Sequence, residues 1–228
     1  MKAPSKKPTF WMDTKWCHMY NQSHAELHDT PDIRWMKMLT AYLPECGIQL
    51  PQNPKVLNIG CGNSVKWNYL GVALYLGNQG LGIPHYFGVD IKEEAFTDAK
   101  RELGSLVNFV VCDAQNLTDF LTGTYHLAIF EHPNLTTSPD GPKIWRKIFQ
   151  ETSKLLDEDG GLILTSFWVN DHIPAQVALE RTRYHIVYNG RNRFPGKKFD
   201  TASNGESLEH DKFIIIAKKA LSCKILAL

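Results

Sequence analysis

From about Pro54 onward, the chain alternates short apolar runs with amphipathic segments, and this alternation restricts the fold more than any other feature. Five apolar runs are bounded by Gly, Asp, Pro or Asn, as buried parallel strands are. They cover residues 55–60, 85–91, 106–113, 126–132 and 161–167. The alternation predicts right-handed strand–helix–strand crossovers, and therefore an α/β fold with a doubly wound, mostly parallel sheet.

The segments between these runs are predicted to be helices. The clearest of them, 142–156, places its apolar residues on one face, and the sequence DEDGG then ends it. The other expected helices cover 64–78, 93–103, about 115–121 and about 173–182.

The two ends of the chain complete this prediction. The runs YHIVYNGRNRF and HDKFIIIAKK near the C-terminus are separated by a loop rich in Gly, Asn and Ser. We expect them to pair as an antiparallel hairpin and to complete a seven-stranded sheet. Residues 1–53, with a helix expected at 31–43, form a short N-terminal helical cap, and residues 54–228 form one compact domain.

Composition excludes several classes of protein. The 228 residues carry a formal net charge of +1, so no global basic field attracts nucleic acid. The five cysteines form no CxxC pair, which argues against a disulfide framework or a zinc site and favours a reducing compartment. No apolar run reaches the length of a membrane span, and no secretory signal is recognisable. We therefore expect a cytoplasmic protein without a membrane partner; its oligomeric state does not follow from the sequence.

The segment VLNIGCGNS, residues 56–64, ends the first predicted strand in a Gly-x-Gly turn. Ligands of open α/β sheets bind beyond the carboxyl ends of the strands, where this turn lies. A dinucleotide fingerprint needs a third glycine, and Val65 stands at that position, so a nicotinamide dehydrogenase is disfavoured. Taken alone, the turn also fits a tight connection without a ligand.

The next three strands also end in polar residues. Asp90 ends the second strand and is placed to accept hydrogen bonds from a ribose diol. Asp113 and Ala114 follow the third, where a carboxylate and a backbone N–H could bind the amino edge of an adenine. The fourth ends in Glu131-His132-Pro133-Asn134. Four such strand ends in order predict a site for an adenosine without phosphates.

These motifs resemble those of the class I S-adenosylmethionine-dependent methyltransferases, from about Lys55 to Phe167 and more loosely to Lys219. VLNIGCG matches the family's first motif, GVDI its second, CDAQNL its third and IFEHPN its fourth. The resemblance implies S-adenosyl-L-methionine as cofactor. The cofactor-binding residues that it implies are Asn58, Gly60, Cys61, Gly62, Asp90, Ile91, Asp113, Ala114 and Phe130.

Two positions in this set need comment. The family usually has an acid where this chain has Asn58, which keeps an acceptor and lacks the charge. A sulfonium cation favours aromatic faces, so Phe130 is a candidate neighbour. Trp11, Trp16 and Tyr20 are further candidates. Packing in the core or the cap is the alternative for each of these rings.

The catalytic candidates are His132, Glu131 and Asn134, because they lie where a substrate meets the methyl group. His132 could deprotonate a hydroxyl, thiol or amine, and Glu131 or Asn134 could orient it. Alternatively, His132 is a hydrogen-bonded residue at a strand end, because many methyl transfers need no base. The sequence EHPN differs from the Asn/Asp-Pro-Pro-aromatic motif of methyltransferases that act on amino groups.

The predicted function is in-line methyl transfer to a small molecule or a protein side chain. RNA methylation is a second hypothesis, motivated by the basic, aromatic-rich stretch 181–198, which also fits a charged sheet edge. A non-catalytic cofactor-binding subunit of the same fold is a third. We predict no metal, because the cluster of His18, His24 and His28 lacks carboxylate partners.

Overall fold

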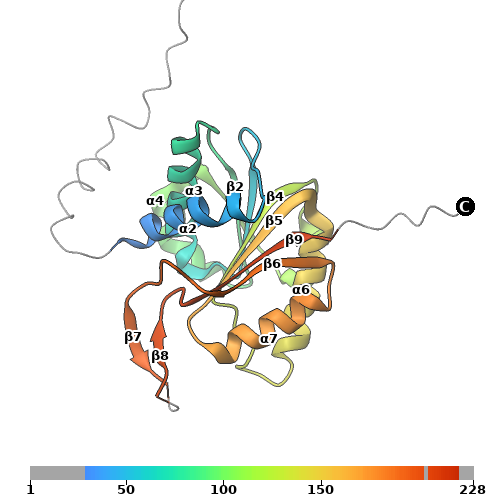
Figure 1. Cartoon of the computed structure of the whole chain (residues 1–228). Helices are drawn as coiled ribbons and strands as arrows, with labels where there is room; N and C mark the ends of the chain where they lie inside the picture. The colour runs from blue at the N-terminus through green and yellow to red at the C-terminus, as the bar shows by residue number, and fades with distance from the viewer. Residues whose placement is uncertain (1–28, 203–204, 221–228) are drawn as a thin grey trace, which may run out of the picture.

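The computed structural model describes residues 29–202 and 205–220, and a seven-stranded sheet lies at its centre. The strand order is β3-β2-β1-β4-β5-β9-β6. Strands β1 to β5 run parallel, whereas β9 lies antiparallel between β5 and β6. Helices cover both faces of this sheet (Figure 1). The predicted α/β fold, with its doubly wound seven-stranded sheet and antiparallel C-terminal pair, is confirmed.

The bounds of the elements follow the predicted alternation closely. The strands are β1 Lys55–Ile59, β2 His85–Asp90, β3 Val107–Val111, β4 Tyr125–Glu131, β5 Leu156–Ser166, β6 Tyr184–Arg191 and β9 Phe213–Lys219. The helices are α2 Pro31–Glu45, α3 Val65–Gln79, α4 Thr97–Leu103, α5 Leu117–Phe120, α6 Gly141–Leu155 and α7 Val169–Glu180. Helix α7 begins four residues before its expected start, and β5 begins five residues early, where Leu156 pairs with Tyr125.

A small second sheet was not predicted. Strands β7 (Lys198–Thr201) and β8 (Ser207–Glu209) pair antiparallel within the segment that we expected to be a loop. All four residues of β7 are exposed, so this hairpin lacks the apolar run by which a buried strand is recognised. The hairpin projects away from the main sheet (Figure 1).

The core has two layers, one on each face of the sheet. Successive residues of a strand point to opposite faces, so Val56 packs in the layer under α2 and α3, and Leu57 packs in the layer under α6 and α7. Helix α2 crosses α3 so closely that a Cβ on Gly71 would lie 2.4 Å from the Cβ of Trp35. In the described part of the chain, no helix combines the length and hydrophobicity needed to cross a bilayer.

Candidate functional site

The turn after β1 is open on its outer side. Gly60 and Gly62 have φ angles of +63° and +48°, a conformation that favours glycine. The Gly60 N–H donates to the Val89 carbonyl at 2.8 Å, which fixes the turn against the end of β2. A Cβ on Gly62 would meet nothing within 4 Å, so a ligand can approach the backbone there.

Asp90 joins the end of β2 to this turn. Its Oδ2 accepts a hydrogen bond from the Gly62 N–H at 3.0 Å, and its Oδ1 accepts one from the Lys92 N–H at 3.1 Å. A carboxylate offers about four lone-pair positions, so Asp90 can still accept from a diol. Ile91, the next residue, is 64% exposed and leaves an apolar side chain uncovered beside the carboxylate.

Cys61, between the two glycines, is buried. Its Sγ lies 3.5 Å from the Val89 carbonyl, to which the thiol donates. Burial, and then the charge of Asp90, raise the pKa of this thiol far above its ordinary value. Cys61 therefore stays protonated and contributes backbone rather than a nucleophile.

The turn after β3 is organised by Asp113. Its Oδ1 accepts a hydrogen bond from the Gln115 N–H at 2.9 Å, which caps the short 3₁₀ helix Ala114–Asn116. The Gln115 side chain also donates to both carboxylate oxygens. The Asp113 carboxylate thus orders its own turn, and the amino group of any ligand bound there would share it with Gln115.

Unpaired acceptors lie below the Gly-x-Gly turn. Asn58 is fully buried; its Nδ2 donates to the Tyr86 hydroxyl at 3.1 Å, whereas its Oδ1 has no hydrogen-bond partner among the described residues. Glu131 Oε2 also lacks a described partner. Burial and the neighbouring Asp211 raise the pKa of Glu131, although His132, and then Asn68 and Ser64, oppose that shift. A buried acceptor without a donor is costly, so this position favours a ligand rich in N–H groups.

Two of the predicted residues lie apart from these acceptors. Phe130 is fully buried, and its ring centroid lies 5.1 Å from that of Phe149 and 6.1 Å from that of Trp145, in the layer under α6. Asn134 is exposed, and its carbonyl accepts from Trp145 Nε1 at 3.2 Å. The geometry gives neither side chain a contact with the described site, and Trp11, Trp16 and Tyr20 lie outside the described residues.

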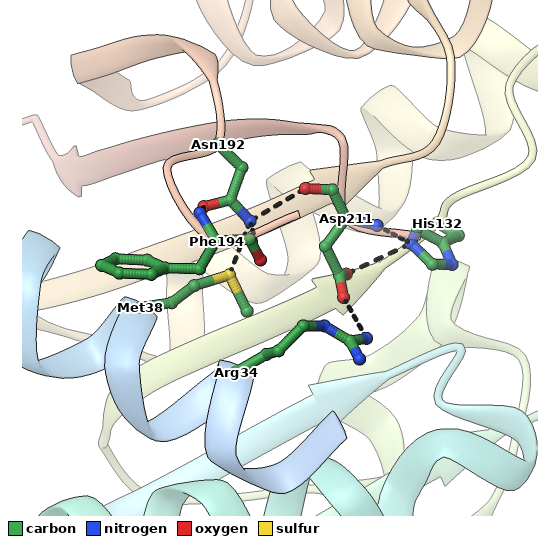
Figure 2. A network of polar contacts seen from close by, with 6 residues as sticks. All are labelled: Arg34, Met38, His132, Asn192, Phe194 and Asp211. Atoms are coloured by element: carbon green, nitrogen blue, oxygen red, sulfur yellow. Dashed lines mark hydrogen bonds and ion pairs between the residues drawn. The ribbon is translucent and has the colours of Figure 1, made fainter. Parts of the chain in front are cut away.

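His132 meets Asp211, a residue of the loop between β8 and β9 that the sequence did not identify. The imidazole Nε2 lies 3.1 Å from the Asp211 backbone nitrogen and 3.2 Å from Asp211 Oδ1 (Figure 2). A neutral ring protonated at Nδ1 accepts from the N–H at its Nε2, whereas a ring protonated at Nε2, neutral or charged, donates to Oδ1. Both residues have a φ of 52°, which is strained for a side chain other than glycine.

A charged and a polar side chain from distant segments contact Asp211. Arg34, on α2, lies 3.1 Å from Oδ2 of the fully buried Asp211 carboxylate, and the Asn192 side chain donates to the Asp211 carbonyl at 2.8 Å (Figure 2). Burial would raise the pKa of Asp211, but His132 and Arg34 lower it well below its ordinary value. Burial would lower the pKa of His132, but the contact with Asp211 outweighs it and raises the pKa.

Glu131, His132 and Asp211 are of the residue types that bind metal ions. One atom each of Glu131, His132 and Asp211 lies within 4.8 Å of the others. No spacing of residues in the sequence indicates this cluster. Because the guanidinium of Arg34 already neutralises Asp211, we interpret the cluster as an ion-pair network rather than as a metal site.

The loop after β4 is fixed by a buried acid of α7. Asp171 Oδ1 accepts from the Leu135 N–H at 3.1 Å, from the Thr136 N–H at 3.0 Å and from the Thr136 hydroxyl at 2.8 Å. The His132 N–H donates to the Thr165 carbonyl at 2.9 Å. These bonds set the path of the segment EHPN, which sequence patterns alone do not define.

The basic stretch 181–198 is locally neutralised at two of its arginines. Arg193 forms two hydrogen bonds with Glu45, at 2.9 and 2.7 Å, and its guanidinium lies 4.4 Å from the ring centroid of Tyr42. Arg191 lies 3.4 Å from Glu209. These contacts give both arginines a structural role at the edge of the sheet.

Comparison with known proteins identifies the family. A family described as "Methyltransferase domain" matches residues 51–220. No curated protein matches the chain.

Solved structures support the fold. An S-adenosylmethionine-dependent methyltransferase from Clostridium acetobutylicum aligns with a TM-score of 0.56 at 12% identity, over 90% of this chain and 98% of that one. A precorrin-6y C5,15-methyltransferase from Geobacter metallireducens aligns with a TM-score of 0.54 at 14% identity, over 81% of this chain and 87% of that one. An rRNA methylase from Streptococcus thermophilus aligns with a TM-score of 0.52 at 13% identity, over 86% of this chain and 99% of that one. The similar structures thus share a fold and differ in the acceptor that their names give.

Proposed function

The chain belongs to the methyltransferase-domain family, and on that premise we propose that it transfers a methyl group from S-adenosylmethionine to a small molecule or a protein side chain. The observation that carries the proposal is the Asp90 carboxylate bonded to the Gly62 N–H, at 3.0 Å, beside an open Gly-x-Gly turn. This arrangement joins an acceptor for a ribose to exposed backbone at the carboxyl edge of a parallel sheet.

The residues around the turn fit this cofactor. The backbone of Gly60, Cys61 and Gly62 would hold the methionine part, and Asp90 the ribose. The unpaired oxygens of Asn58 and Glu131 suit the cofactor's ammonium group, which brings the donors that they lack. The proposed adenine neighbours are Ile91, Asp113 and Ala114.

The acceptor would meet the methyl group at the end of β4. S-adenosylmethionine supplies an already activated methyl group, so the protein mainly aligns and desolvates the reactants. His132 is the proposed base, with Asp211 as the partner of its Nε2. Glu131 lies on the cofactor side of this pair, and Asn134 is proposed only to shape the loop.

The other hypotheses receive less support. Arg191 and Arg193 are paired with Glu209 and Glu45, so the basic stretch offers RNA fewer free cations than its sequence indicates. The ordered His132–Asp211 pair argues for catalysis rather than for a non-catalytic subunit.

Isothermal titration with S-adenosylmethionine tests the proposal. We expect binding in the micromolar range that is usual for enzymes and their small ligands, and tighter or similar binding of the demethylated product. Absence of binding at millimolar cofactor would overturn the proposal. Transfer of a labelled methyl group to any acceptor in a compound and protein panel would then exclude a purely cofactor-binding role.

A further inference from the structure

Four rings form a closed circuit at the end of β4, the place proposed above for methyl transfer, and we refer to His132, Phe167, Phe199 and His210 as the aromatic circuit. The ring centroid of His132 lies 5.2 Å from that of Phe167 and 5.7 Å from that of His210. The centroid of Phe199 lies 5.7 Å from that of Phe167 and 4.7 Å from that of His210. The rings come from the ends of β4 and β5, from β7, and from the residue after β8.

This circuit is poorly explained by packing. Phe199 is 50% exposed and belongs to a strand without any buried residue, so it contributes little to the core. His210 is exposed, whereas Phe167 is half-buried. Trp168 extends the surface, since its ring is nearly parallel to that of Phe167 at 6.4 Å. Partly exposed rings that gather around one histidine form a surface suited to a flat ligand.

The histidine of the circuit has one nitrogen available. Nε2 faces Asp211, whereas Nδ1 has no hydrogen-bond partner among the described residues. With Nε2–H directed at Asp211 Oδ1, the lone pair of Nδ1 is free to take a proton. In this tautomer Asp211 Oδ1 already faces the Nε2–H, at 3.2 Å, and the contact becomes an ion pair when the ring takes a proton at Nδ1.

We propose that the aromatic circuit binds the methyl acceptor, and that the acceptor is a flat, aromatic small molecule with an ionisable hydroxyl group. This inference rests on the proposed function. In the reaction, a bond forms between the hydroxyl oxygen and the methyl carbon while the carbon–sulfur bond breaks and its electron pair stays on sulfur. The hydroxyl proton moves to His132 Nδ1, and Asp211 acts as the positioning residue for the resulting imidazolium.

The chemistry favours an aromatic hydroxyl over other nucleophiles. A phenolic hydroxyl has a pKa of about 10, which brings its proton within reach of an imidazole base. An aliphatic hydroxyl holds its proton far more tightly and gains little from stacking. Neighbouring ring centroids lie 4.7–5.7 Å apart, so a flat compound would stack on the exposed side of the rings.

Binding without cofactor tests the first part of the proposal. The probes are 2-naphthol, catechol and 8-hydroxyquinoline, with decahydro-2-naphthol as the hydroxyl compound that is not flat. We expect at least one aromatic probe to bind by isothermal titration and decahydro-2-naphthol to bind at least tenfold more weakly. Phe199→Ala should weaken binding about tenfold, the scale of one lost aromatic contact. The control Phe120→Ala removes another exposed phenylalanine, 56% exposed on α5, and should leave binding unchanged.

Methyl transfer tests the second part. Asp211→Asn should lower kcat toward the bound probe with little change in KM. It should also move the acidic limb of the pH–rate profile to lower pH, because the carboxylate that raises the pKa of His132 is gone. A purely structural role of Asp211 would leave the position of that limb unchanged.

The outcomes separate this inference from the proposed function. If the protein binds S-adenosylmethionine and none of the three aromatic probes, the acceptor assignment is wrong and the proposed function stands. Equal loss of binding in Phe199→Ala and Phe120→Ala, or methylation of a structured RNA instead of the probes, also overturns it. If S-adenosylmethionine itself does not bind, the proposed function fails first.

Discussion

The two halves of the sheet's carboxyl edge are built in different ways. The half proposed for the cofactor, the cofactor half, is formed by the turns after β1, β2 and β3; its polar groups come from short motifs, and the bonded residues Gly62 and Asp90 are 28 positions apart. The half proposed for the acceptor, the acceptor half, is formed after β4 and β5; its charges come from distant segments, since Arg34 and Asp211 are 177 positions apart. The first half depends on local backbone geometry, and the second depends on the completed fold.

This difference has an energetic consequence. In the cofactor half, carboxylates accept bonds from backbone N–H groups of neighbouring turns and remain near solvent. In the acceptor half, the fully buried Asp211 carboxylate is stabilised by its ion pair with Arg34 and by its contact with the His132 ring, and loss of the Arg34 charge would leave it without a permanent cationic partner. Substitutions in the two halves should therefore affect different quantities, ligand affinity in one and folding stability in the other.

The largest effect is expected for Arg34→Met, which keeps the aliphatic stem and removes the partner of Asp211. Breaking a buried ion pair on one side costs about 3–5 kcal/mol, so the free energy of unfolding should fall by that amount. Urea denaturation measures it. The control Lys37→Met, on the same helix, removes a pair in which both side chains are over one-third exposed, and it should cost under about 1 kcal/mol. Similar losses in both variants would contradict the comparison.

The next effect tests the cofactor half. Asp90→Ala removes the acceptor of the Gly62 and Lys92 N–H groups and of the proposed ribose bonds. We expect the affinity for S-adenosylmethionine to fall about 100-fold, because hydrogen bonds to a charged group contribute about 1.5–3 kcal/mol each. The control Asp98→Ala removes an exposed acid of α4 and should leave the titration unchanged. Unaltered binding in Asp90→Ala would exclude this carboxylate from the cofactor site.

The sequence predicted the two halves to different extents for the same physical reason. The seven-stranded sheet, the turn at Gly60 and the acid at Asp90 follow from periodicity and from motifs a few residues long. His132 was identified because it ends a strand. Asp211 and Arg34 lie in segments without any motif, and only the antiparallel insertion of β9 and the packing of α2 bring them to His132.

Errors of prediction follow the same rule. The hairpin β7–β8 consists of polar, exposed residues, so neither its existence nor the position of Phe199 could be read from hydrophobic periodicity. Phe130 packs in the layer under α6, and its assignment to the cofactor site stays a prediction.

A smaller effect is expected where α2, which carries Arg34, crosses α3, which follows the cofactor turn. In Gly71→Ala, the new Cβ would lie 2.4 Å from Trp35 Cβ and 2.8 Å from the Asp32 carbonyl oxygen. The helices must separate, and overpacking of this kind costs about 1–3 kcal/mol in thermal or urea unfolding. The control Gly77→Ala, on the same helix, meets nothing within 4 Å and should be neutral or stabilising by about 0.5–1 kcal/mol. Destabilisation by both would show that helix propensity does not govern α3.

The smallest effect is the pH dependence of stability, and it distinguishes two histidines whose pKa values are shifted in opposite directions. The pKa of His132 is raised by Asp211 against the opposing effect of burial, and the groups facing it are Asp211, Glu131, Arg34 and His210. A raised pKa gives stability that is present below the ordinary histidine pKa and is lost as the pH rises through the folded-state value. The stability difference between wild type and His132→Gln should therefore shrink from about pH 6 to about pH 9.

His172 supplies the matched opposite case. Burial lowers its pKa, and its ring nitrogens lie 2.9 Å from the Ser166 hydroxyl and 2.6 Å from Asn189 Oδ1. The neutral ring is favoured in the folded state, so its stability contribution is present above the ordinary pKa and is lost as the pH falls. The difference between wild type and His172→Gln should shrink from about pH 7 to about pH 5, which is the opposite direction. If both differences changed in the same direction, the charge of Asp211 would not control His132, and the acceptor half would lose its proposed base.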